Sequence, residues 1–291
     1  RAVFRDPASF RGAIFNGRSD FFQCLFQLGA FCEEAHFRGD ASFKSATFKG
    51  LYFEEAEFAS DALFNDALFE EKASFKNVKI GGELNFIGLR CAAPINFKGI
   101  SVAGDAWFRT AKFEGTTIFT EAKFKSKADF RFVEFRKFAY FRSARFEGEA
   151  EFSETIFEDT VIFTISRFDL EVKFFEAEFR AFASFERARF YGPVDFKAAR
   201  SSSAFDLTDA SFLDVPDFNQ MSFLEAPRLD ALNIRPQRFV ALREKMKAHR
   251  FSHLSKYIPV RLGEWLVENF LGDKEISARW RALQRLADRA H

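Results

Sequence analysis

Phenylalanine recurs along this chain at an alternating interval. From Phe108 to Phe196 the spacing between successive Phe residues alternates between five and six. A small or β-branched residue usually stands two positions before each of these Phe residues, and most other positions are polar. An α-helix keeps one face at intervals of three and four residues, and a simple strand alternates every two, so neither explains the interval. The pattern predicts a solenoid in which each short side points a small residue and a Phe inward and then turns a corner.

Four such sides close a square coil of 22 residues. We call the inward Phe positions central. Their frame runs from Phe4 to Ile234 and predicts about ten coils, with one corner a residue short where Phe48, Phe53 and Phe58 follow at steps of five. With strands about 4.8 Å apart, the rod would be about 50 Å long. Other residues replace Phe at eight central positions: Cys32, Ile80, Cys91, Val102, Ser201, Leu207, Leu229 and Ile234.

Central residues one coil apart should lie one above another and fill the interior with rings, which leaves no room for a ligand. This structural core ladder is predicted for Phe108, Phe130, Phe152, Phe174 and Phe196. Glycine often stands two residues after the central position, where a tight corner would require positive φ. These glycines are Gly12, Gly17, Gly39, Gly99, Gly115, Gly148 and Gly192.

The series of small-x-Phe units, such as Ala128-Asp129-Phe130 and Ala144-Arg145-Phe146, resembles the pentapeptide-repeat family, and within it the Phe-centred subgroup. The resemblance covers about four fifths of the chain. It implies an all-β solenoid in the form of a right-handed quadrilateral β-helix, in a bacterial protein. We therefore expect residues 1–234 to form the solenoid domain and residues 235–291 to form a C-terminal helical cap or linker region.

The C-terminal region is basic, with 13 Lys and Arg against 6 Asp and Glu, and its apolar residues follow a helical period. We expect one helix after Pro236, a second over 259–271 and a third from about Lys274. The third helix would place four apolar residues on one side: Ile276, Trp280, Leu283 and Leu286. These faces could cap the open end of the rod, join two chains in a homodimer, or lie on a membrane surface.

Residues that could carry chemistry are few. All three cysteines, Cys24, Cys32 and Cys91, fall on interior positions and are expected to be buried thiols. His249 and His253 could share a helix face, but no third metal ligand is apparent. We therefore expect no enzyme activity, no cofactor and no metal site. Outward aromatic residues are a different signal, since Phe138 and Phe182 occupy one column two coils apart with Tyr140 beside them. They either pack against the corner of the coil or form an exposed apolar contact site, and we take them as our candidate interaction surface.

The sequence favours a non-catalytic structural scaffold or protein-interaction module. The alternative, implied by the resemblance, is a DNA mimic that binds a type II topoisomerase such as gyrase. That role requires a long acidic face, whereas Lys and Arg are interleaved with Asp and Glu along the rod.

Direct nucleic-acid binding is not expected, and the protein partner is not identified. No stretch is long and apolar enough to cross a bilayer. The last segment resembles the linker that precedes a membrane-embedded region in multi-domain members of the family. We therefore expect a cytoplasmic protein, held at the inner face of a membrane if such a region follows.

Overall fold

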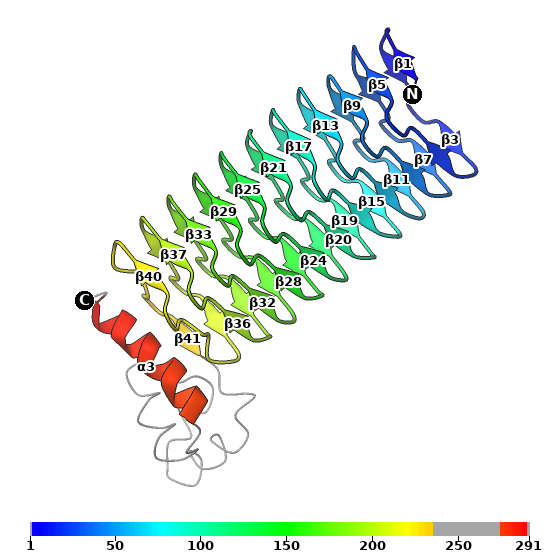
Figure 1. The fold of residues 1–291 in the computed structure, drawn as a ribbon. Helices are drawn as coiled ribbons and strands as arrows, with labels where there is room; N and C mark the ends of the chain where they lie inside the picture. The colour runs from blue at the N-terminus through cyan, green and yellow to red at the C-terminus, as the bar shows by residue number, and fades with distance from the viewer. Residues whose placement is uncertain (1, 235–273, 290–291) are drawn as a thin grey trace.

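The computed structural model of the protein is a square solenoid of parallel β-strands followed by one α-helix, α3 (Lys274–Arg289) (Figure 1). It describes residues 2–234 and 274–289, and within the helix the side chains of residues 278–285. Over the described residues the strands form four parallel sheets of 11, 10, 11 and 9 strands, one for each side of the square. The chain makes about eleven coils rather than ten, because a partial last coil adds an eleventh strand to two sheets.

Each strand has two residues, and we name the sheets A to D in the order in which the chain first enters them. Sheet A contains β1 (Val3–Phe4), β5 (Leu25–Phe26), β9 (Thr47–Phe48), β13 (Leu68–Phe69), β17 (Arg90–Cys91), β21 (Lys112–Phe113), β25 (Glu134–Phe135), β29 (Ile156–Phe157), β33 (Glu178–Phe179), β37 (Arg200–Ser201) and β40 (Ser222–Phe223). Sheet B contains β2 (Ala8–Ser9), β6 (Ala30–Phe31), β10 (Leu51–Tyr52), β14 (Ala73–Ser74), β18 (Ile95–Asn96), β22 (Thr117–Ile118), β26 (Ala139–Tyr140), β30 (Val161–Ile162), β34 (Ala183–Ser184) and β38 (Phe205–Asp206). Sheet C contains β3 (Ile14–Phe15), β7 (His36–Phe37), β11 (Glu57–Phe58), β15 (Lys79–Ile80), β19 (Ser101–Val102), β23 (Lys123–Phe124), β27 (Arg145–Phe146), β31 (Arg167–Phe168), β35 (Arg189–Phe190), β39 (Ser211–Phe212) and β41 (Asn233–Ile234). Sheet D contains β4 (Ser19–Asp20), β8 (Ala41–Ser42), β12 (Ala62–Leu63), β16 (Leu84–Asn85), β20 (Ala106–Trp107), β24 (Ala128–Asp129), β28 (Ala150–Glu151), β32 (Val172–Lys173) and β36 (Val194–Asp195).

The predicted core ladder is present. Phe130 and Phe152 stack with ring centroids 4.8 Å apart, and the other neighbouring pairs from Phe108 to Phe196 lie 4.5–5.1 Å apart with ring planes within 9° of parallel. Rings from opposite sides meet edge to face, as Phe130 of side D does with Phe141 of side B at 5.6 Å and 87°. Both geometries suit the quadrupole of an aromatic ring, so the interior is stabilised beyond the burial of its apolar area.

The short corner lies between β9 and β10. Strands one coil apart are usually 22 residues apart, as Leu51 and Ala73 are, but Leu51 pairs with Ala30 at a separation of 21. Lys49 and Gly50 make this corner, and Gly50 has a φ of 85°. The missing residue is absorbed at the corner, because the next coils return to the 22-residue register.

The expectation for the corner glycines was only partly correct. Gly12 and Gly99 have positive φ, but Gly17, Gly39, Gly115, Gly148 and Gly192 do not. At Gly192 a Cβ atom would come within 2.2 Å of the Leu170 carbonyl carbon one coil earlier, so the reason for glycine there is the close approach of two backbones. Positive φ occurs instead after the central residues of sheets B and D, mostly at residues other than glycine, including Phe132 and Ile165.

Where the central Phe is missing at Ser201, a large residue on the next side of the coil fills the space. Ser201 occupies a central position in sheet A, and Phe205 occupies the preceding small position of the next side. The Phe205 ring lies 5.4 Å from Phe179 and 5.5 Å from Phe223, the central residues below and above Ser201. Phe205 therefore fills the space that a ring at position 201 would occupy, which keeps the interior packed.

The third predicted helix is present as α3, at the C-terminal end of the solenoid beside β40 and β41 (Figure 1). Trp280 and Leu283 are fully buried and belong to the same apolar cluster as Phe218 and Ile234. The Arg279 Nε atom lies 3.8 Å from a carboxylate oxygen of Asp217. The other two predicted helices, and the domain boundary after residue 234, lie outside the described residues.

Candidate functional site

The outer surface of the solenoid is a set of columns, because residues one coil apart lie side by side on neighbouring strands. In every strand one residue points inward, and the residue immediately before the central position points outward. This outward position is the first residue of each strand in sheets A and C and the second in sheets B and D. The four columns differ strongly in charge, so each sheet presents a different surface.

On sheet A, charges of opposite sign alternate. Arg136 lies 2.8 Å from Glu114, one coil earlier, and 3.5 Å from Glu134. Arg180 repeats the arrangement two coils later with Glu158 and Glu178, each at 2.7 Å. These are cross-strand pairs that stabilise neighbouring coils and leave little net charge on this sheet.

Sheet C carries a run of cations. Lys123, Arg145, Arg167 and Arg189 follow one another in register on four neighbouring strands. Carboxylates in the adjacent column partly neutralise this run, since Arg145 lies 3.2 Å from Glu147. At the C-terminal end of the run, the Arg167 guanidinium stacks over the Tyr191 ring at 4.4 Å.

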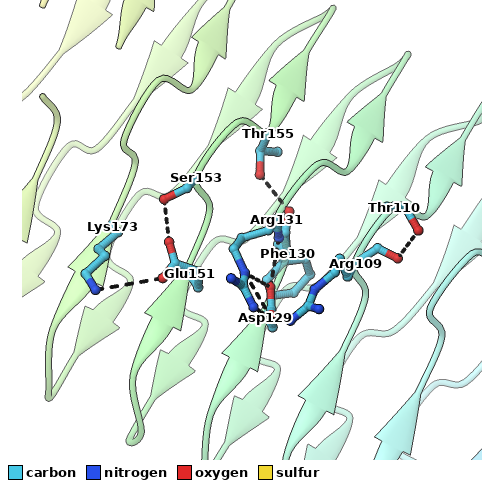
Figure 2. Close-up of polar contacts among 9 residues, drawn as sticks. All are labelled: Arg109, Thr110, Asp129, Phe130, Arg131, Glu151, Ser153, Thr155 and Lys173. Carbon is cyan, nitrogen blue, oxygen red and sulfur yellow. Dashed lines mark hydrogen bonds and ion pairs between the residues drawn. The ribbon is translucent and has the colours of Figure 1, made fainter. Parts of the chain in front are cut away.

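Sheet D contains a buried carboxylate, Asp129, at an outward position (Figure 2). Arg131 and Arg109 each donate a hydrogen bond to its Oδ2 atom, at 2.6 and 2.8 Å, and the Arg131 Nε and backbone N–H donate to Oδ1 at 3.0 and 3.1 Å. Burial alone would raise the pKa of Asp129, but the hydrogen bonds from the two arginines outweigh it and lower the pKa below its usual value.

The neighbours of Asp129 on sheet D are also engaged. One coil later Glu151 accepts a hydrogen bond from Ser153 and lies 4.0 Å from the Lys173 ammonium (Figure 2). On the interior side the Thr155 hydroxyl donates to the Phe130 carbonyl oxygen at 2.7 Å. With its oxygens occupied by two guanidinium groups, Asp129 is arranged to hold coils together rather than to act as a base.

Sheet B differs from the other three because its outward column carries no charge over nine successive coils. This column is Ser9, Phe31, Tyr52, Ser74, Asn96, Ile118, Tyr140, Ile162 and Ser184. Its centre is apolar, since Ile118 pairs in register with Tyr140 and Tyr140 with Ile162. Interface cores are depleted in charge and enriched in aromatic residues, so sheet B has the composition of a binding surface.

The three residues predicted as an interaction surface all lie on this sheet or at its edge. The Phe138 ring is 40% exposed and stacks against Tyr140 with centroids 5.9 Å apart. Phe182 is half-buried two coils beyond Phe138, with Thr160 between them, as backbone hydrogen bonds along this column show.

Sequence reasoning missed two neighbours, Ile118 and Ile162, although each stands immediately before a central Phe, where a residue must face outward. We refer to these five residues as the sheet B patch: Ile118, Phe138, Tyr140, Ile162 and Phe182.

The reactive side chains lie elsewhere. Cys24, Cys32 and Cys91 are buried free thiols, and burial raises the pKa of Cys91 to about 12. His36 is exposed on sheet C, 3.5 Å from Glu57. His249 and His253 lie outside the described residues. Over residues 2–234 and 274–289 no three His, Cys, Asp or Glu side chains form a group that could hold a metal ion. In the same part of the chain no helix has the length and apolarity needed to cross a bilayer.

Comparison with protein families agrees with this architecture. The family model for pentapeptide repeats, which describes nine copies of the repeat, matches residues 1–47, 43–90 and 119–167, about half of the chain. A search of curated proteins gives no match. The matched segments fall on coils of the square parallel solenoid, and their stacked Phe residues occupy the centre of each repeat. This chain therefore belongs to the pentapeptide-repeat family.

Proposed function

We propose that this protein is a non-catalytic scaffold that binds a protein surface through the outer face of sheet B. The observation that carries the proposal is the sheet B patch, where Phe138 is 40% exposed and stacks against Tyr140 of the uncharged column. Exposed apolar side chains gathered on one face of a soluble protein commonly mark interaction sites. The flat sheet supports the aromatic rings rigidly, so little conformational entropy would be lost on binding.

The interior supports a scaffold rather than an enzyme. The central residues from Phe26 to Phe218 are buried and fill the coil, so the described solenoid offers its outer faces rather than an enclosed cavity for recognition. On those faces, the best candidate for a general base or metal ligand, Asp129, is saturated by Arg109 and Arg131. A membrane-anchored role and a cytoplasmic location remain expectations from the sequence.

The DNA-mimic alternative has an acidic column in its favour, at the corner between sheets C and D. It contains Asp40, Asp61, Glu83 and Asp105, is interrupted by Lys127 on the next coil, and continues with Glu149 and Glu171. Asp61 and Asp105 accept hydrogen bonds from backbone N–H groups of the next coil, at 2.8 and 3.2 Å. Asp61 and Asp105 thus satisfy corner backbone groups, and Lys127 breaks the run of negative charge that a DNA mimic requires, so we favour the scaffold.

Photo-crosslinking tests the proposal. A benzophenone amino acid at Phe138 should form covalent protein adducts in the native cell, and excess unlabelled wild-type protein should suppress them. An excess of the Phe138→Asp variant should not. The matched control places the same group at Phe22, a more exposed Phe (51%) far from the patch. If position 138 gives no more adduct than position 22, the proposed function is wrong.

A further inference from the structure

We infer that the sheet B patch binds a second copy of this chain, with the two solenoids antiparallel and related by a two-fold axis beside Ile162. This inference rests on the proposed function, since it takes the outer face of sheet B as the binding surface. The partner is inferred from the order of residues along three neighbouring columns of that face. When each column is reversed about this axis, its residues lie opposite residues that complement them.

The geometry follows from the solenoid. When two identical sheets pack face to face about a two-fold axis along the strand direction, each column meets its own copy in reverse order. An axis beside Ile162 exchanges the coil of Tyr140 with the coil of Ser184, since β26, β30 and β34 are successive strands. Such an interface is isologous: each contact occurs twice, with the roles of the subunits exchanged.

Four of the five residues of the sheet B patch match in this arrangement, and the fifth, Ile118, lies opposite Asp206 of the partner subunit, the first charged residue of the outward column. In the outward column, the large Tyr140 faces the small Ser184 of the partner subunit, and Ile162 faces Ile162 of the partner subunit. At the edge of the sheet, Phe138 faces Phe182 of the partner subunit, because Phe138, Thr160 and Phe182 are one coil apart in turn. Tyr140 thus meets a small residue, Ile162 meets its own copy, and Phe138 forms an aromatic pair, which gives the shape complementarity that an interface core requires.

The charged residues match about the same axis. The column on the other side of the central residues reads Lys98, Thr120, Arg142, Thr164, Glu186, Thr208 and Asp230, with one coil between successive members. Reversal about Thr164 brings Arg142 opposite Glu186 of the partner subunit and Lys98 opposite Asp230 of the partner subunit. Among the described residues Arg142 makes no ion pair, although it is exposed, and Glu186 has only a loose contact of 3.6 Å with Arg187. Opposite charges fix the register of such an interface.

Other registers and other sheets are disfavoured. An axis one coil earlier would place Arg142 against its own copy, and an axis one coil later would do the same to Glu186. Sheet C would oppose its cations, Arg145 and Arg167 among them, to one another. The proposed axis also passes beside Asp159, at a corner, and so brings it near its own copy. Its carboxylate accepts a hydrogen bond from the Thr160 backbone N–H at 2.7 Å, which turns it toward its own chain.

Sedimentation of the full 291-residue chain over a range of concentrations tests the inference. We expect a monomer–dimer equilibrium in which Arg142→Glu and Glu186→Arg each weaken dimerisation at least tenfold. The double variant R142E/E186R should restore it. An equimolar mixture of the two single variants should form a heterodimer, because both sets of charges are again opposite. Arg90→Glu, a charge reversal at an exposed position of sheet A, should leave the equilibrium unchanged.

A second measurement does not depend on charge. Ile162→Cys should crosslink to its own copy with a short bismaleimide, whereas Ile156→Cys on sheet A should not. A chain that is monomeric at all concentrations overturns the inference, as does a dimer that none of the sheet B changes affects. If the chain is monomeric but the Phe138 crosslinker captures a different protein, the proposed function stands and this inference fails.

Discussion

Phe130 and Phe152 are 22 residues apart in the sequence, yet their rings stack with centroids 4.8 Å apart and planes 5° from parallel. Phe130 stacks in the same way on Phe108, one coil before it, and meets rings of other sides edge to face. The stability of the solenoid is therefore a sum of contacts between neighbouring coils, as in other repeat proteins.

Replacement of Phe130 by Ala should lower the free energy of unfolding by about 3–5 kcal/mol, because it removes a ring from a filled core and leaves a cavity. Urea denaturation followed by circular dichroism measures the change. Phe132 is the matched control, since it is the same residue type two positions later but 45% exposed. Phe132→Ala should change stability by less than about 0.5 kcal/mol. Equal effects of the two changes would contradict the assignment of central positions.

Ile165→Asn should stabilise the protein by about 1 kcal/mol, because a left-handed backbone costs a non-glycine residue roughly 1–2 kcal/mol and Asn tolerates it better. Ile165 has a φ of 61° and is 45% exposed, so little apolar burial is lost. Thermal unfolding measures the gain. Ile156→Asn, on strand β29, should instead lower the melting temperature because Asn is disfavoured in strands. A loss of stability in the Ile165 variant would show that its side chain matters more than its backbone strain.

Asp129→Asn should lower the free energy of unfolding at pH 7 by about 1.5–3 kcal/mol, the range for hydrogen bonds to a charged group. Because the pKa of Asp129 is lowered in the folded protein, its stabilisation is fully present above the unfolded pKa of about 3.9. The stabilisation is lost as pH falls through the folded value. The stability difference between wild type and variant should therefore shrink in acid.

Denaturation curves at several pH values measure this difference. Glu154→Gln, at an exposed carboxylate nearby, should show little effect at any pH. A difference that does not depend on pH would exclude the ionised form of Asp129 as its cause.

Trp280→Ala should destabilise the C-terminal end of the solenoid by about 3–5 kcal/mol, since a fully buried large side chain is truncated. We expect faster amide exchange in β39, β40 and β41 and unchanged exchange in β20 and β24, because coils interact with their nearest neighbours. Hydrogen exchange with mass spectrometry resolves the two regions. Unchanged exchange near β41 would mean that α3 does not cap this end. Deletion of residues 235–291 should have a stronger effect of the same kind and promote aggregation through the open strand edges.

The protein should leave supercoiling by a bacterial type II topoisomerase unchanged at stoichiometric amounts. The charges on its sheets are largely paired within the solenoid, as between Arg136 and Glu114 at 2.8 Å, so they do not form a continuous anionic surface. A gel-based supercoiling assay with purified gyrase measures the effect. Inhibition, or protection of gyrase from a poison, would revive the DNA-mimic alternative.

The architecture was predictable because its signal is additive along the chain. A single small-x-Phe unit says little, but a series of them fixes which residue of each side points inward, and the short corner after Phe48 was predicted in the same way. The position of Phe205 was not, because its ring fills space left by Ser201 on a different side of the coil. That relation depends on packing in three dimensions rather than on the interval between residues.

The candidate surface was predictable only in part. Phe138, Tyr140 and Phe182 stand out as aromatic residues at outward positions, whereas Ile118 and Ile162 become significant only when the register places them beside Tyr140. The saturation of Asp129 by Arg109 could not be predicted either, because the pairing depends on side-chain conformations across two coils. Which outward residues become neighbours on adjacent coils is therefore the feature that is hardest to predict from the sequence.

The corner at Lys49 and Gly50 shows how such a chain can change length in evolution. A residue is missing there, yet the coils that follow keep their faces aligned, because each strand takes its place from the strand beneath it and not from a running count of residues. Deletions at corners are therefore tolerated locally, and the gain or loss of a whole coil by gene duplication lengthens or shortens the rod by one strand spacing, about 4.8 Å. The length of the rod is thus proportional to the number of coils that the gene encodes. A surface several coils long can therefore be lengthened or shortened without a change in the packing of the core.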